Sequence, residues 1–508
     1  MQANTMLETL KLVVHHVDTQ GWERLAGALE TNTILKTLNL VGYLIGDQHA
    51  ERLAGALETN TTLKTLQLLF IGDQSVEWIV GALVRNTALE TLNLAGNHIG
   101  EQGVERIALA LQTNATLTTF DLTGNHIWDQ GVERIAAALE TNTMLKTLDL
   151  ACNNIGDQGV ERMALALETN TTLTSLHLAG NRIKDQGVEW IAVALEANTT
   201  LTTLDLSRNC IEDQGAERIA VMLETNTTLK TLHLTGNHIE DRGAEQIAGA
   251  LETNTTLTNL FLGWNHIGDQ GAERSAVALG TNIALTTLDL SRNSIGDQGV
   301  ERIAVALETN STLATLDLVG NHIGDQGIDR IAIALESNTT LTTLHLSRNN
   351  IADQGVERIA AALETNTALT TFDLSRNHIG DQGAERIAIA LETNTSLKSL
   401  DLAGNSIGHQ GAERVADAWR RRMPVLVLTL RCVPNGSNAF TTTCTTVSGR
   451  IIAMLELSRT ACFVDVQRMI SEHCELDLGK CRLQLILPDG MLLQDLTGKL
   501  TLGEMLDR

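Results

Sequence analysis

The chain has 508 residues, of which 43% are hydrophobic but only 3% are aromatic, so its core must be built from aliphatic side chains. Its formal net charge is −24, and the segment 1–423 carries 29 Lys and Arg side chains against 52 Asp and Glu side chains. Such an acidic surface repels phosphate backbones and anionic lipid, which argues against nucleic acid or a membrane as the main partner. It favours a protein partner of basic or mixed charge.

The cysteines and the amino-terminal residues indicate the compartment. Seven cysteines form no CxxC pair, and only Cys152 and Cys210 lie in the segment 1–423, which is typical of a reducing compartment. Residues 1–18 contain no unbroken apolar run of signal-peptide length, and no stretch is long enough to span a bilayer. We therefore expect the cytoplasm, with the nucleus as the alternative.

A pattern of about 28 residues, LxxLxLxxNxIxDQGxExIAxALExNTx, recurs along the chain, as in residues 201–228. The last leucine of LxxLxL recurs fifteen times from Leu12 to Leu402, and one step, after Leu68, is two residues shorter. Repetition at a fixed period indicates a solenoid, in which each unit packs only on its neighbours. The prediction is a solenoid of about 15 repeats over residues 1–423.

Each repeat predicts a strand followed by a turn. In LxxLxL the alternating leucines point to one face of the strand and the residues between them to the other. The asparagine after the strand recurs twelve times from Asn97 to Asn405. A buried amide at that position can satisfy the backbone groups of neighbouring turns and stack as a ladder. The first three repeats lack this asparagine, so we expect the amino-terminal end to be less regular.

A helix is predicted after each turn. Asp213 stands where an N-cap residue would accept the first free N–H groups of its helix. Apolar residues at helical spacing form the buried stripe, at Ala216, Ile219, Ala220 and Leu223. Helices need about 10 Å of width and parallel strands about 4.8 Å, so stacked repeats must curve with the strands inside.

These repeats resemble the ribonuclease-inhibitor-type leucine-rich repeats, which share LxxLxLxxNxI, this repeat length and a full helix. The DQGxExIAxAL segment is similar to the carboxy-terminal repeats of NOD-like receptors and to the repeats of Ran GTPase-activating proteins. The resemblance covers about four fifths of the chain. It implies an α/β leucine-rich-repeat solenoid, a horseshoe with a parallel concave sheet and convex helices. It implies no particular partner, because this architecture hosts many functions.

The residues that point into the concavity are the candidates for binding. The residue before the last leucine of each strand is Asp or His in most repeats, whereas Phe261 and Trp264 place aromatic rings among these polar neighbours. Exposed aromatic rings on a concave surface are typical of interaction anchors. The alternative is that the two rings pack on each other without a partner. The predicted protein-binding residues are Asp205, Arg208, His233, Phe261, Trp264, Asp289, Arg292 and Asp317.

Asp and His alternate on neighbouring strands, as in Asp205 with His233 and Asp317 with His345. Side chains on adjacent strands are about 5 Å apart, close enough to share a proton or a metal ion. A polar, solvated face is the interpretation we favour over a metal site.

Two other sets of residues recur by position. Trp78 and Trp190 replace the usual arginine of the helix and are expected on the convex side, as candidates for a second contact. A histidine column follows the asparagine, and its recurrence favours a structural or surface role: His98, His126, His238, His266, His322 and His378.

The repeat pattern stops at residues 419–424, where Pro424 prevents continuation of the last helix. Beyond it the pattern predicts strands, a helix, a tight turn at a PDG triplet and a further short strand. The predicted strands are 425–433, 449–457 and 481–487, and the predicted helix is 463–474.

This order resembles the ubiquitin-like β-grasp domains, so we expect such a domain over residues 424–508. By that resemblance Ile486 would lie on the sheet face that those domains use for recognition. The chain reaches Arg508 without the last strand of that fold and without a Gly-Gly end, so conjugation is not expected. Two explanations for the missing strand stay open: the sequence is truncated, or another segment takes the place of that strand. At the other end, the first strand, Leu7–Leu12, has no capping unit before it, which leaves a missing upstream segment or pairing with another chain.

The enzyme motifs GxxxxGK[ST], HExxH and CxxC are missing from the sequence. The carboxylates recur by repeat position, which is typical of solvated surface. We therefore predict no catalytic residue, no cofactor and no metal. The expected function is a protein-binding scaffold or adaptor. Two alternatives follow from the resemblances: a GTPase activator acting in trans on a small GTPase, and a ribonuclease-inhibitor-like inhibitor of a basic enzyme.

Overall fold

The computed structural model describes residues 6–14, 19–422, 425–434, 439–446, 451–458 and 482–486. Fifteen strands alternate with fifteen helices up to residue 422. The strands are β1 (Thr9–Val14), β2 (Thr37–Ile45), β3 (Thr65–Ile71), β4 (Thr91–Asn93), β5 (Thr119–Asp121), β6 (Thr147–Asp149), β7 (Ser175–His177), β8 (Thr203–Asp205), β9 (Thr231–His233), β10 (Asn259–Phe261), β11 (Thr287–Asp289), β12 (Thr315–Asp317), β13 (Thr343–His345), β14 (Thr371–Asp373) and β15 (Ser399–Asp401).

The helices that follow these strands are mostly eleven to thirteen residues long. They are α1 (Thr19–Thr31), α2 (Asp47–Thr59), α3 (Asp73–Leu83), α4 (Glu101–Thr113), α5 (Trp128–Leu139), α6 (Asp157–Thr169), α7 (Asp185–Ala197), α8 (Asp213–Thr225), α9 (Asp241–Leu251), α10 (Asp269–Thr281), α11 (Asp297–Leu307), α12 (Asp325–Ser337), α13 (Asp353–Thr365), α14 (Asp381–Thr393) and α15 (His409–Arg422).

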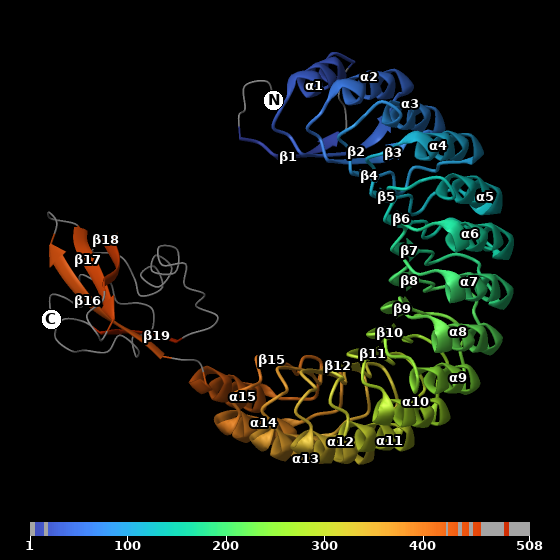
Figure 1. Ribbon diagram of the computed structural model, residues 1–508. Coiled ribbons are helices and arrows are strands. Elements are labelled where there is room, and N and C mark those ends of the chain that lie inside the picture. The colour runs from blue at the N-terminus through green and yellow to red at the C-terminus, as the bar shows by residue number, and fades with distance from the viewer. Residues whose placement is uncertain are drawn as a thin grey trace. The chain divides into compact units, whose positions relative to one another are not determined.

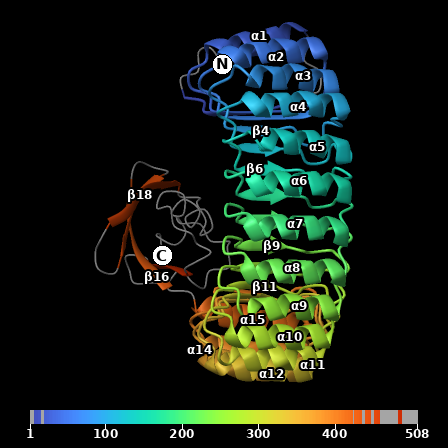
Figure 2. The ribbon, with the colours of Figure 1, turned by 45° about the vertical axis from the view of Figure 1, so that its right-hand side comes forward.

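The chain divides into two compact units, residues 1–379 with 396–406 and residues 380–395 with 407–508. The first unit contains all fifteen strands of one parallel sheet, whose order follows the chain from β1 to β15. Figure 1 shows that within this unit the strands line the inner side of an arc and the helices α1 to α13 its outer side. Figure 2 shows these helices stacked side by side in one layer. The predicted α/β solenoid is confirmed.

Parallel pairing sets equivalent residues of consecutive repeats side by side, so Leu204 lies beside Leu232 and Asp205 beside His233. The leucines point toward the helices and are buried, and the residues between them therefore point to the inner face of the arc. The predicted helix stripe is buried as well. The core of one repeat consists of Leu201, Leu204, Leu206, Ile211, Ala216, Ile219, Ala220, Met222 and Leu223.

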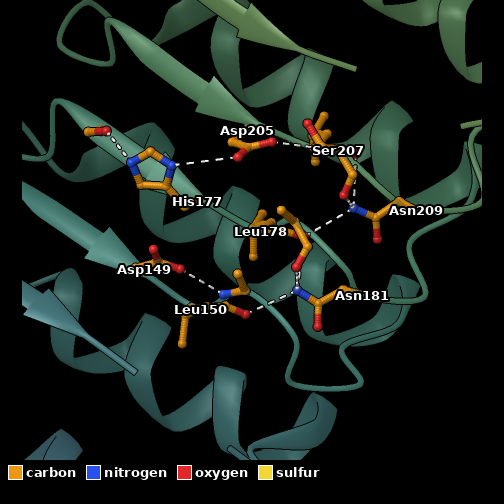
Figure 3. Close-up of polar contacts among 12 residues, drawn as sticks. Asp149, Leu150, His177, Leu178, Asn181, Asp205, Ser207 and Asn209 are labelled. Atoms are coloured by element: carbon orange, nitrogen blue, oxygen red, sulfur yellow. Dashed lines mark hydrogen bonds and ion pairs between the residues drawn. The ribbon is translucent and has the colours of Figure 1, made fainter. Parts of the chain in front are cut away.

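The asparagine ladder predicted after the strands is present, and Figure 3 shows two of its members. The amide nitrogen of Asn209 donates to the backbone oxygens of Leu178, at 3.0 Å, and Leu206, at 3.0 Å. Its side-chain oxygen accepts from the backbone N–H of Ile183 at 3.0 Å. Asn209 is buried, so each such amide joins the turns of consecutive repeats where the sheet ladder ends.

A second asparagine, at the end of each helix, joins repeats in the same way. Asn226 donates to the backbone oxygen of Leu195 at 2.7 Å and accepts from the N–H of Leu229 at 2.8 Å. These bonds hold the chain where it passes from the helix to the next strand.

The predicted N-cap role of Asp213 is wrong in one respect. The N-cap of α8 is Glu212, which makes no side-chain cap bond. The Oδ1 atom of Asp213 instead accepts from the backbone N–H groups of Glu240, at 2.8 Å, and Gly243, at 2.9 Å, in the next repeat. Asp213 therefore caps the start of the following helix. In the stacked repeats, the N–H groups at the start of α9 lie closer to its carboxylate than those of its own helix.

The amino-terminal repeats are less regular, as expected from their missing asparagine. β2 has nine residues and β3 has seven, whereas the strands from β4 to β15 have three each. The shortened step removes two residues within β3, because the pairing of β2 with β3 shifts register between Val41 and Ile45, opposite Leu69 and Ile71. The first asparagine of the ladder, Asn97, accepts from the N–H of Ile71 at 2.7 Å and thereby starts the regular part.

In the second unit, the strands β16 (Val425–Pro434), β17 (Ala439–Thr446), β18 (Ile451–Ser458) and β19 (Arg482–Ile486) form a sheet of order β18-β17-β16-β19. β16 runs parallel to β19 and antiparallel to β17. The three predicted strands are present. β17 is a further strand that the sequence pattern did not predict, and its run of β-branched Thr side chains accounts for it. The predicted helix at 463–474 and the PDG turn lie outside the described residues.

Among the residues that the structure describes, no helix combines the length and apolar character needed to cross a bilayer.

Candidate protein-binding surface

The first row of side chains on the inner face, here called the strand row, is the residue before the last leucine of each strand. From β4 to β15 it consists of Asn93, Asp121, Asp149, His177, Asp205, His233, Phe261, Asp289, Asp317, His345, Asp373 and Asp401. Parallel pairing sets these residues side by side, for example Phe261 between His233 and Asp289.

The aspartates of the strand row have a structural role that the sequence did not reveal. One carboxylate oxygen of each accepts from the backbone N–H two residues later, at 2.8–2.9 Å, and so holds the chain as it leaves the strand. The other oxygen is left for a neighbour or a partner. These aspartates are Asp121, Asp149, Asp205, Asp289, Asp317, Asp373 and Asp401.

Asp205 pairs with a histidine, but not with the one that we expected. His177 on β7 lies with its Nδ1 atom 3.8 Å from Oδ2 of Asp205 (Figure 3), whereas the ring of His233 stacks on Phe261. The nearby carboxylate of Asp205 raises the pKa of His177 above its ordinary value, against the opposing effect of burial. Burial raises the pKa of Asp205, but the imidazole of His177 and the hydrogen bond from Ser207 outweigh it, so the net pKa is lowered.

The other shifted groups of the row show that it is a partly desolvated acidic surface. Burial raises the pKa of Asp149 and of Asp317. Neighbouring carboxylates, Asp289 and Asp373, add to the raised pKa of Asp317. Burial lowers the pKa of His233. A basic group of a partner placed here would therefore meet carboxylates that lack full hydration.

The His177–Asp205 pair predicts a pH-dependent stability. Because the folded pKa of His177 is above 6.5, its contribution is fully present below pH 6.5 and is lost as the pH rises through the folded pKa. The contribution of Asp205, whose folded pKa is below 3.8, is lost only as the pH falls through that lower value. We expect the stability difference between the wild-type chain and His177→Gln to be about 0.5 kcal/mol near pH 6 and to decline as the pH rises from there through the folded pKa of His177.

Urea unfolding of both chains across this pH range measures the difference. His345→Gln is the control, since His345 stands in the same row. A difference that grows with rising pH would contradict the assignment of the pair.

The second row, here called the turn row, lies two residues beyond the last leucine of each strand from β4 to β15. Its backbone is in the left-handed region, with φ between +54° and +75°. Gly occupies six positions, at φ +67° to +75°, and Cys152 a seventh. The remaining positions are Arg208, Trp264, Arg292, Arg348 and Arg376. A side chain in this conformation costs about 1 kcal/mol relative to Gly. These five side chains are thus retained at a cost in stability, as is common where a residue serves binding.

Trp264 is the large exposed ring of the inner face, with 59% of its surface accessible. The guanidinium carbon of Arg292 lies 4.7 Å from the centroid of the indole ring, within the range of a cation–π contact. The stem of Arg292 lies beside Gly320, where a Cβ atom would meet its Cδ at 2.6 Å. The missing side chain of Gly320 therefore makes room for Arg292 beside the indole ring.

The two predicted aromatic anchors, Phe261 and Trp264, contact different neighbours. The ring of Phe261 is half-buried and stacks on His233, with 4.2 Å between centroids and 5° between planes. Phe261 and Trp264 belong to different rows, and each ring contacts another partner, His233 or Arg292. Trp264 is thus the more exposed of the two predicted anchors.

The structure places all eight predicted residues on one inner surface of the first unit, across β8 to β12 and the turns that follow them. The strand row supplies Asp205, His233, Phe261, Asp289 and Asp317, and the turn row supplies Arg208, Trp264 and Arg292. Acidic and basic side chains therefore run in two parallel rows.

The other recurrent residues lie where the sequence predicts. Trp78 and Trp190 are 40% exposed on α3 and α7 of the outer layer. The histidine column is exposed, and two pairs of its members stack, His98 with His126, whose ring nitrogens lie 3.1 Å apart, and His238 with His266. Within the described part of the chain, no group of three or more His, Cys, Asp or Glu side chains is arranged to hold a metal ion.

The family described as "Leucine Rich repeat" matches twelve segments that together cover more than half of the chain, so the chain belongs to the leucine-rich-repeat family. The matched residues are 85–108, 113–136, 141–164, 169–192, 197–220, 225–248, 253–274, 281–304, 309–332, 337–360, 365–388 and 393–416. No curated protein matches the chain.

Several solved structures are similar to the chain. An internalin (inlF) from Listeria monocytogenes is 23% identical over 73% of this chain and 87% of its own, with a TM-score of 0.44. A chain from a complex of Rad7 and Elc1 in yeast has 16% identity over 71% of this chain and 84% of its own, with a TM-score of 0.42. The actin-binding site 2 of leiomodin-1 is 28% identical over 25% of this chain and 73% of its own, with a TM-score of 0.23.

Proposed function

We propose that this chain is a protein-binding scaffold or adaptor whose partner lies on the inner face across β8 to β12. Trp264 carries the proposal. Its ring is 59% exposed, and its backbone adopts a conformation that Gly would hold at lower cost. Leucine-rich-repeat solenoids typically present such a curved face to a protein partner. Trp in the centre of an interface is among the residues that contribute most to affinity.

The charge of the two rows supports a partner of mixed charge. The strand row offers carboxylates, of which Asp289 and Asp317 flank Phe261 on one side. The turn row offers the guanidinium groups of Arg208 and Arg292. A partner segment that carries both signs complements both rows, and complementary charge increases the association rate and specificity.

The test is a quantitative pull-down from cell lysate with the full chain, followed by an affinity measurement on the protein retained. Trp264→Gly suits the left-handed backbone, so the variant is expected to fold as well as the wild-type chain. We expect its affinity to fall roughly tenfold or more. Trp190→Ala, which removes an exposed ring from the outer layer, serves as the matched control and should leave the affinity unchanged.

If the wild-type chain and Trp264→Gly retain the same proteins with equal affinity, Trp264 is not the anchor of the partner. Loss with Trp190→Ala and not with Trp264→Gly would place the contact on the outer layer. If the partner is a small GTPase, a hydrolysis assay decides between a scaffold and an activator.

We also propose three finer assignments. The repeat length of about 28 residues, with helices of eleven to fourteen residues, supports the ribonuclease-inhibitor type of repeat. The strands at 425–434, 451–458 and 482–486 support a ubiquitin-like second docking module, although β17 is an addition to the expected order. The unpaired thiols of Cys152, which is exposed, and Cys210 support a cytoplasmic location. Imaging of a fluorescently tagged chain tests the last of these.

A further inference from the structure

Three arginines of the turn row stand close together beyond the Trp264 anchor. Arg292, Arg348 and Arg376 line a shallow depression of about 950 Å³ on the first unit, together with His322 and His378. Asp401 is the one carboxylate among the described residues that line it. Arg348 and Arg376 are exposed, and Arg292 is half-buried beside Trp264. The depression is therefore a basic site on a chain whose net charge is −24.

The backbone brings these arginines into one row. The N–H of Arg348 donates to the oxygen of Ser375 at 3.0 Å, and that of Arg376 to the oxygen of Ala403 at 2.7 Å, so the turns stack as the strands do. Consecutive turns lie about 4.8 Å apart, which makes Arg348 and Arg376 direct neighbours. Repulsion from Arg376, and then from Arg292, lowers the pKa of Arg348.

No carboxylate of the described part of the chain forms an ion pair with any of these three guanidinium groups. The arginines of the outer helices differ, because most of them pair with a glutamate of the preceding repeat. Examples are Arg218 with Glu189 at 3.2 Å and Arg330 with Glu301 at 3.5 Å. The turn-row arginines thus combine mutual repulsion, a left-handed backbone and no compensating carboxylate, three unfavourable features that a bound anion would offset.

We propose that Arg292, Arg348 and Arg376 bind a phosphorylated serine or threonine of a protein partner. The inference rests on the proposed function, since it takes the ligand to be a segment of a protein. A phosphate group carries up to two negative charges and three acceptor oxygens, which match several guanidinium groups along one depression better than a carboxylate does. A nucleic acid fits less well, because its continuous phosphates would extend over Asp317, Asp373 and the rest of the acidic strand row.

The test uses the full chain and two fluorescein-labelled peptide pools of degenerate sequence, identical except that the central residue is phosphoserine or serine. Fluorescence anisotropy should show roughly tenfold tighter binding of the phosphoserine pool. Arg348→Gly with Arg376→Gly should abolish the difference between the pools. Gly is the ordinary residue of the turn row at φ +67° to +75°, so this variant is expected to fold at least as well as the wild-type chain.

Arg242→Gln is the control, because it removes the same charge from helix α9 of the outer layer, where Arg242 pairs with Glu217 at 3.3 Å. It should keep the preference for phosphoserine. Inorganic phosphate should compete with the phosphoserine pool, as expected for the same site.

Equal binding of the two pools would overturn the inference. So would a single-stranded oligonucleotide that binds more tightly than the phosphoserine pool and depends on the same two arginines. Either result leaves the proposed function untouched if Trp264→Gly still loses its partner, and the two proposals therefore fail separately.

Discussion

Replacing Asn209 by alanine is expected to destabilise the solenoid by about 3 kcal/mol. The buried amide accepts the N–H of Ile183 and donates to the backbone oxygens of Leu178 and Leu206. The two oxygens keep a second donor each, from Asn181 and Asn237. The N–H of Ile183 loses its partner inside the fold, and an unsatisfied buried donor costs about 1–3 kcal/mol beyond the lost hydrogen bonds.

Urea unfolding measures the loss of stability, and hydrogen exchange read by mass spectrometry locates it at the amide of Ile183. Asn350→Ala is the control. Asn350 directly follows the ladder residue Asn349 of another repeat, but its side chain is exposed. Its effect should stay within about 0.5 kcal/mol. Unchanged protection of Ile183 in Asn209→Ala would show that the ladder does not hold this turn.

The substitution Gly243→Ala is expected to destabilise the solenoid by about 2 kcal/mol. A Cβ atom at this position would lie 2.6 Å from Oδ1 of Asp213, 2.8 Å from Cβ of Ala216 and 2.9 Å from Cγ2 of Ile239. Two helices would have to separate, and the cap bond from Gly243 to Asp213 would lengthen. This steric cost exceeds the gain of up to about 1 kcal/mol that Ala brings to a helix.

Gly249→Ala in the same helix reverses the sign. No atom lies within 4 Å of a Cβ placed there, so only the helix preference remains and the chain should gain about 0.5–1 kcal/mol. Thermal unfolding of the two variants beside the wild-type chain decides the matter. Destabilisation by both substitutions, or by neither, would contradict the role of Gly243 as the point of close approach between repeats.

The substitutions in the turn row are expected to reduce binding without reducing stability, whereas those of Asn209 and Gly243 are expected to reduce stability. Arg348→Gly and Arg376→Gly remove side chains from a left-handed backbone and should not weaken the fold, yet they are expected to abolish recognition of phosphoserine. Asn209 and Gly243 act on the fold alone. Comparison of the two kinds of variant therefore separates a residue that holds the solenoid from a residue that serves a partner.

The sequence by itself determined the architecture, because the repeat places each residue type at one structural position. Leucines at LxxLxL, the asparagine after the strand and the stripe of α8 are where the period predicts, since a pattern repeated at a fixed interval has one self-consistent packing. The rows of the inner face follow from the same alternation. The eight candidate residues therefore lie on one surface, as expected from their positions in the repeat.

Only the tertiary structure decided which neighbour each side chain contacts. Asp213 caps the next helix, Asp205 contacts His177, and Phe261 stacks on His233. Each side chain has two equivalent neighbours along the stack, and sequence spacing gives no preference between them. The choice depends on the twist and offset between consecutive repeats, which are properties of the packed solenoid. The left-handed backbone conformation at Trp264 is likewise seen only in the folded structure.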